Sequence, residues 1–149
     1  MRVEELEVVC QEAARNLVAR SDGAIAASVV LPLPSKTSVT TLPDWPDDEP
    51  ARLELLEHFT EEVARPNNAA CYGFVAEALA ADEDGQPVDV VVVAFGARNN
   101  HPRVAAAVLA EGGLGEFTPS EPLAPSAMPF LAPLQRAVDH ARPPDAFSG

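Results

Sequence analysis

The sequence is poor in cysteine, lysine and aromatic residues, and it contains no long hydrophobic run. Two cysteines, one lysine, one tryptophan and one tyrosine occur in 149 residues. No apolar stretch approaches the roughly 18 residues of a membrane-spanning helix, and the sequence does not open with the charged and apolar regions of a secretory signal. We therefore expect a cytoplasmic protein with no membrane partner, in which Cys10 and Cys71 are free thiols.

Positive charge is also scarce. The chain has 10 Lys and Arg against 23 Asp and Glu, which gives a formal net charge of −13. Nucleic acid is not an expected partner, because phosphate binding needs a basic surface, and an anionic membrane surface is disfavoured for the same reason. Arginine supplies nearly all the positive charge, which together with abundant alanine, valine and proline is typical of GC-rich bacterial coding rather than of a function.

The chain does contain enough apolar residues for one folded domain, since 47% of its residues are hydrophobic and 22% charged. A chain of this length buries about two-thirds of its unfolded surface on folding, so it needs neither a disulfide nor a metal for stability. We expect residues 1–149 to form a single globular domain. Within it, residues 32–50 form a proline-rich connection and residues 142–149 a loose tail.

Three segments carry apolar residues at the spacing of an amphipathic helix, namely residues 3–20, about 50–64 and about 129–141. Acidic residues precede or occupy the first turn of the first two segments, where the helix dipole favours negative charge. Gly23 follows the first segment and Pro66 the second, and both residue types end helices. The sequence therefore predicts two or three helices.

Strands are predicted between these helices. Residues 24–31 are uncharged, residues 70–79 alternate in character, and residues 88–95 are apolar on both faces, as in a central strand. Residues 103–110 fit either a helix or a strand, and the strand is favoured because a Gly-Gly pair follows and leads into residues 114–118.

The predicted order is helix, strand, helix, strand meander, helix. Consecutive strands joined by short turns pair antiparallel. We expect an α+β fold with one mainly antiparallel sheet of four to five strands and two or three helices packed on it.

The turn at residues 96–101 contains the best candidate ligand-binding residues, Arg98, Asn100, His101 and Arg103. Two arginines can hold a carboxylate or phosphate group through bidentate hydrogen bonds. The same residue types also suit a tight turn, because asparagine tolerates left-handed backbone. An enzyme or ligand-binding protein for a small anionic molecule is therefore the alternative function.

Trp45 is the candidate interface residue. It lies within residues 32–50, where five prolines fall in nineteen positions. Tryptophan is enriched at binding hot spots, and flanking prolines reduce the order lost on binding. The other interpretation is that Trp45 packs against the second helix of its own chain.

Other polar residues give weaker signals. Glu54, His58 and Glu62 follow helical spacing and could share a metal, but a solvated acidic face is the favoured interpretation. Cys71 and His58 would need spatial contact to act as a nucleophile pair. For Glu77 we expect an outward position at the end of an edge strand.

No catalytic signature, complete metal-ligand set or cofactor motif is found in the sequence. We therefore expect no metal and no cofactor. The favoured function is a non-enzymatic binding or assembly module whose partner is itself, as a homo-oligomer, or another protein.

Overall fold

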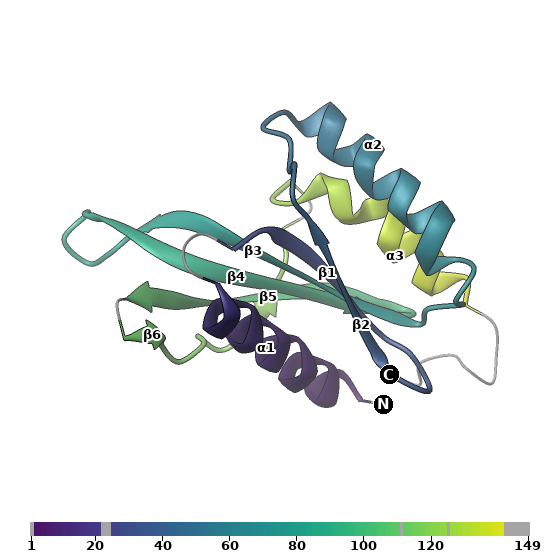
Figure 1. The fold of residues 1–149 in the computed structure, drawn as a ribbon, viewed down its shortest axis with the longest axis horizontal. Coiled ribbons are helices and arrows are strands. Elements are labelled where there is room, and N and C mark those ends of the chain that lie inside the picture. Colours follow the sequence, from purple (N-terminus) through teal and green to yellow (C-terminus); the bar gives the residue numbers. More distant parts are fainter. Residues whose placement is uncertain (1, 22–24, 111, 125, 142–149) are drawn as a thin grey trace.

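The computed structural model describes residues 2–21, 25–110, 112–124 and 126–141, so the predicted tail at 142–149 lies outside the described residues. The described residues form an α+β fold with three α-helices and one seven-stranded antiparallel sheet (Figure 1). The strand order is β2-β1-β3-β4-β5-β6, and β7 also pairs with β5. None of the described helices is long and apolar enough to cross a membrane.

The helices are α1 (Val3–Arg20), α2 (Glu49–Phe59), its π-helical continuation η1 (Thr60–Ala64), the 3-10 turn η2 (Pro129–Leu131) and α3 (Ala132–Asp139). The strands are β1 (Ala27–Pro32), β2 (Thr37–Leu42), β3 (Cys71–Ala81), β4 (Pro87–Ala97), β5 (Asn100–Ala110), β6 (Gly113–Leu114) and β7 (Glu121–Pro122).

Helices cover both faces of the sheet. Helix α1 packs on one face, and α2 and α3 pack on the other (Figure 1). Side chains of a strand point alternately to the two faces. Accordingly, Tyr72 and Phe74 join a core under α2 and α3, here called the aromatic core. Cys71 and Val75 join a core under α1, here called the α1 core.

The prediction of four to five strands is wrong, because the sheet has seven. The two strands without a predicted counterpart, β2 and β7, are short, and β7 spans only two residues. Strand β2 lies inside residues 32–50, which were predicted as a proline-rich connection. The prolines bracket this strand rather than interrupt it, and Thr37–Leu42 is uncharged and rich in β-branched residues, which suit a strand.

The meander follows the prediction more closely. Residues 103–110 are in strand β5, which confirms the strand interpretation over the helix. The strand expected at 114–118 is reduced to β6 at Gly113–Leu114. Beyond it the chain follows β5 through isolated hydrogen bonds, in which the Gly115 and Thr118 N–H groups donate to the carbonyls of Val108 and Ala106.

Candidate functional site

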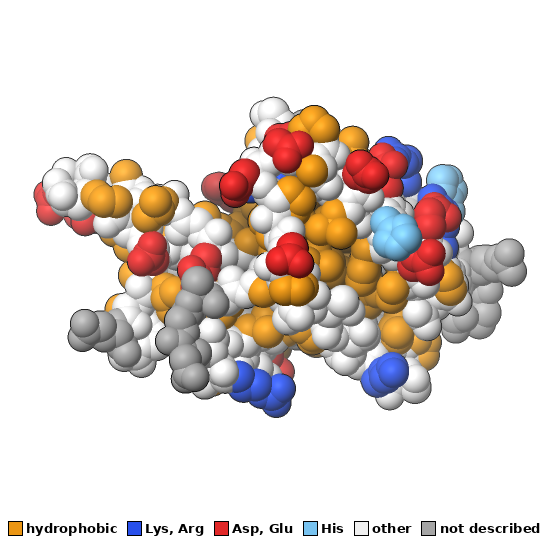
Figure 2. Space-filling view, turned by 45° about the horizontal axis from the view of Figure 1, so that its top comes forward, with side chains coloured by type: hydrophobic (Ala, Val, Ile, Leu, Met, Phe, Trp, Pro, Cys, Tyr) orange, Lys and Arg blue, Asp and Glu red, His pale blue; other side chains and the backbone are white. Residues whose placement is uncertain are grey.

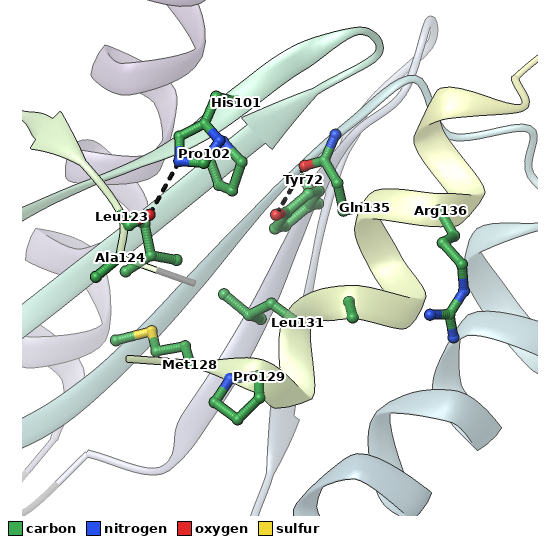
Figure 3. Close-up of a pocket in the computed structure, with 11 residues that line it drawn as sticks. Tyr72, His101, Pro102, Leu123, Ala124, Met128, Pro129, Leu131, Gln135 and Arg136 are labelled. Carbon is green, nitrogen blue, oxygen red and sulfur yellow. Dashed lines mark hydrogen bonds between the residues drawn. The ribbon is translucent and has the colours of Figure 1, made fainter. Parts of the chain in front are cut away.

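A cavity of about 310 Å³ lies between α3, the segment before it and the start of β5 (Figure 3). We call it the α3 cavity. Its walls are mainly apolar and include Leu123, Met128, Pro129 and Leu131. Small-molecule sites are concave and mainly apolar, with a few polar groups that orient the ligand. The size and lining of the α3 cavity fall within that description.

The polar end of the cavity is formed by Tyr72 from β3 and Gln135 from α3. The Tyr72 hydroxyl donates to Gln135 Oε1 at 3.0 Å. Gln135 Nε2 donates to the carbonyls of Ala97 and Asn100 and to Asp139 Oδ1, at 3.1, 3.3 and 3.0 Å. These bonds fix the Gln135 amide orientation, because only its nitrogen can donate.

Burial, reinforced by the charge of Asp139, raises the pKa of the Tyr72 hydroxyl well above its ordinary range. Tyr72 is fully buried and therefore keeps its proton at neutral pH. It is a hydrogen-bond donor in this site rather than a general base.

His101 lines the mouth of the cavity from β5 and is exposed to solvent. Its Nε2 lies 2.9 Å from the Leu123 carbonyl, which can only accept a hydrogen bond (Figure 3). Nε2 therefore carries the proton, and Nδ1 of the neutral ring is an acceptor.

The four predicted ligand residues do not converge on one cavity. His101 lines the α3 cavity, and Asn100 contributes its backbone carbonyl to Gln135. Arg103 donates to the Ser120 hydroxyl at 2.9 Å and to the Ser120 carbonyl at 2.7 Å. Arg98 is half-buried, and its Nε is a buried atom for which the described residues offer no hydrogen-bond partner.

Asn99 and Asn100 have the backbone conformation and hydrogen bonds of a tight turn, which was the other interpretation of these residues. Asn99 has a left-handed φ of 59°, and its N–H donates to Asp139 Oδ1 at 2.8 Å. The Asn100 side chain donates to the Arg98 carbonyl at 2.9 Å. The asparagines therefore shape the connection between β4 and β5 and attach it to α3.

Trp45 packs within its own chain. It is half-buried, and its ring lies 5.3 Å from Phe74 and 5.1 Å from Phe130, between ring centroids. The Arg52 guanidinium lies 5.4 Å from the Trp45 ring centroid, a cation–π arrangement. A second cavity of about 430 Å³ lies beside Trp45 and also contacts Arg52 and Glu77.

Glu77 differs from the expectation of an edge strand. Strand β3 lies between β1 and β4, so Glu77 is on a central strand. Its carboxylate is half-buried and accepts a hydrogen bond from the Ile25 N–H at 3.0 Å. This bond supplies the partner that a partly buried carboxylate requires.

The polar face of α2 is an acidic surface groove. His58 lines it together with Glu54 and other acidic residues, whereas Glu62 does not. Figure 2 shows acidic side chains spread around apolar surface on this side of the molecule. Among the described residues, no group of three or more His, Cys, Asp or Glu side chains is placed to hold a metal ion.

The two thiols lie in the α1 core, on the opposite face of the sheet from α2, so the structure does not bring Cys71 and His58 together. Both cysteines are free and buried. Burial raises the pKa of Cys71 to about 11, and it raises that of Cys10 further. Neither thiol is activated as a nucleophile, because activation requires a lowered pKa.

Tyr72 and Gln135 were not among the predicted site residues. A tyrosine on the buried side of an alternating strand was the available signal, because a buried hydroxyl usually finds a partner. Nothing in the sequence indicated that this partner lies on the last helix.

Comparison with known proteins finds no matching family model, no matching curated protein and no matching solved structure.

Proposed function

We propose that the protein is a non-enzymatic binding module whose α3 cavity takes a small, mainly apolar ligand. The observation that carries the proposal is the wall of this cavity, which is apolar except for Tyr72, His101, Gln135 and Arg136. A ligand with a short hydrocarbon body and one hydrogen-bonding group matches this lining.

The polar groups of the cavity support binding rather than catalysis. The Tyr72 hydroxyl and the Gln135 amide already bond to each other. His101 Nε2 is already bonded to the Leu123 backbone carbonyl. A nucleophile–base pair within hydrogen-bond reach, which covalent catalysis requires, is not formed by these residues.

A neutral ligand is favoured over the anionic one of the alternative function. Arg103 is already bonded to Ser120, and Arg98 does not line the cavity. Arg136 does line it, but its side chain extends from α3 away from Tyr72 and His101 (Figure 3). The net charge of −13 also repels anions.

The homo-oligomer predicted from the sequence is part of the same proposal. It is supported by the strand edge of β2, which the described residues leave without a partner strand. It is not supported by Trp45, whose ring is engaged with Phe74 and Phe130 of its own chain.

The test is a calorimetric titration with 1-hexanol and, separately, with hexanoate. We expect 1-hexanol to bind with a Kd on the order of 1 mM, as suits a ligand of few atoms, and hexanoate to bind more weakly. Ala132→Phe, at an exposed position on the cavity wall, should weaken binding about tenfold or more by filling the space.

Ala19→Phe on α1 is the matched control, because Ala19 is also an exposed helical alanine but lies on the other side of the sheet. It should leave binding unchanged. Tighter binding of hexanoate than of 1-hexanol would favour the anionic alternative. Binding that is absent, or insensitive to Ala132→Phe, would overturn the proposed site.

A further inference from the structure

The two edges of the sheet differ in whether a further strand pairs with them. The outer side of β5 is covered by β6 and β7, which both pair with it. The outer side of β2 has no partner strand among the described residues. Exposed edges are usually protected by charged residues, prolines or bulges. Thr37–Leu42 contains no charged residue and no proline, and its pairing with β1 is regular.

The phase of the β1–β2 ladder shows which backbone groups face outward. The Leu33 N–H donates to the Lys36 carbonyl at 2.8 Å, which marks a hydrogen-bonded position at the hairpin end. Positions alternate along an antiparallel ladder. Ser38, opposite Leu31, therefore exchanges hydrogen bonds with β1, as do the even-numbered residues that follow it. The N–H and C=O groups of Thr37, Val39 and Thr41 point away from the sheet.

We propose that β2 pairs antiparallel with β2 of a second copy of this chain, around a two-fold axis at Val39. In this register Val39 faces Val39 of the second copy, and Thr37 faces Thr41 of the second copy. Each such pair exchanges two hydrogen bonds, so all three outward residues are satisfied. The inference rests on the homo-oligomer of the proposed function and is independent of the α3 cavity.

The chemistry of the edge fits a second copy because it is self-complementary, as a two-fold interface requires. Val39 is 43% exposed and is one of few large apolar side chains on the surface of the described residues. Pairing would bring two Val39 side chains together and would form Thr37–Thr41 cross-strand pairs, which stabilise sheets.

The distribution of charge also favours pairing between two copies of the chain at the β2 edge. Lys36 is the only lysine and immediately precedes β2, and Asp44 follows the strand. In the proposed register Lys36 stands opposite Leu42 of the second copy and therefore diagonal to its Asp44, within reach of a long side chain. Elsewhere the charge of −13 makes two copies repel, so an uncharged edge bounded by opposite charges is where they can meet.

The first experiment is sedimentation velocity over a concentration series with the full chain and two lysine variants. Val39→Lys places two like charges on the axis and should weaken dimerisation about tenfold or more. Leu79→Lys is the matched control, because Leu79 is a strand residue with 73% exposure that lies away from β2, and it should leave dimerisation unchanged. Added salt should strengthen the dimer by screening repulsion.

The second experiment fixes the register by cross-linking. Paired residues at a hydrogen-bonded position have Cα atoms about 5.5 Å apart, which a disulfide can bridge. Under mild oxidation Val39→Cys should therefore form a covalent dimer, whereas Thr37→Cys should not. Cys10 and Cys71 are buried and do not compete.

These experiments distinguish failure of the β2 edge pairing from failure of the proposed homo-oligomer. A monomer at every concentration would overturn both the edge pairing and the homo-oligomer. A dimer that tolerates Val39→Lys would overturn the edge pairing and leave the homo-oligomer in place. Equal cross-linking of Val39→Cys and Thr37→Cys would overturn the register.

Discussion

The two faces of the sheet are built from different side chains. The aromatic core combines Phe74, Phe130 and Trp45 under two short helices. The α1 core packs mainly valine, alanine and cysteine side chains, together with Phe95, against one long helix. Within it, Gly73 lies directly beneath Cys10. Both cavities described above lie on the aromatic side. The comparison indicates that the two sides differ in packing, because both of these cavities lie beside the aromatic core.

Substitutions of Phe74 and Val75 should give the largest changes in unfolding free energy. These two residues are neighbours on β3, are both buried and point to opposite faces of the sheet. Phe74→Ala should lower the free energy of unfolding by about 3–5 kcal/mol. Val75→Ala should cost about 2 kcal/mol, because it removes about two buried carbon atoms rather than a buried phenyl ring. Denaturant titration measures both.

Tryptophan emission adds a specific readout to this pair. The Trp45 ring contacts Phe74, so Phe74→Ala should shift its emission, and Val75→Ala should not. Equal emission changes in the two variants would show that the faces are not independent.

Gly73 tests how tightly the α1 side is packed. A Cβ added at Gly73 would collide with Cys10 Sγ, which a short side chain on a helix cannot easily move. Gly73→Ala should therefore cost about 2–3 kcal/mol of unfolding free energy. Adding Cys10→Ala to this variant should recover part of the loss, because it removes the colliding sulfur. Strict additivity of the two substitutions would contradict the proposed contact.

High pH should weaken the α1 side through its thiols. Burial raises the pKa of Cys71 from 9.0 to about 11, so the unfolded chain releases this proton before the folded chain does as pH rises. The stability contributed by the protonated thiol is complete below pH 9 and is lost between pH 9 and about 11.

We expect a loss on the order of 2 kcal/mol across this window, measured as the unfolding free energy at several pH values. Cys71→Ala should flatten that part of the profile. A profile that is equally steep without Cys71 would assign the pH dependence to other groups.

Tyr72→Phe is the smallest expected effect and concerns the aromatic side. It removes the donor to Gln135 Oε1 and should cost about 1 kcal/mol, because a hydrogen bond contributes on that order. Gln135 keeps its bonds to Ala97 and Asp139, so the fold should persist. A cost below a few tenths of a kcal/mol would show that the hydroxyl bond does not order the site.

The local patterns in the sequence predicted the helices and the long strands. Alternation at residues 70–79 assigned Tyr72 and Cys71 to opposite faces, and the structure places them so. Strand β2 was not predicted, because the surrounding prolines indicated an irregular connection. Its six uncharged residues nevertheless pair with β1. Such pairing depends on a partner strand, which local composition does not reveal.

The candidate site was harder to predict, because it is assembled from distant parts of the chain. Tyr72 and Gln135 are 63 residues apart in sequence and meet only after α3 docks on the sheet. Arg98 and Arg103 were predicted to lie at one pocket, yet Arg103 bonds to Ser120, and only His101 of the predicted group lines the cavity. Proximity in sequence therefore does not show which residues of a turn line a cavity.

The most direct test of the account is an amide chemical-shift titration of the 15N-labelled protein with 1-hexanol. We expect saturable shifts confined to the α3 cavity, with Leu123, Leu131 and Gln135 among the residues affected and α1 unaffected. Shifts that map to α1, or that do not saturate, would contradict the assignment of ligand binding to the aromatic side.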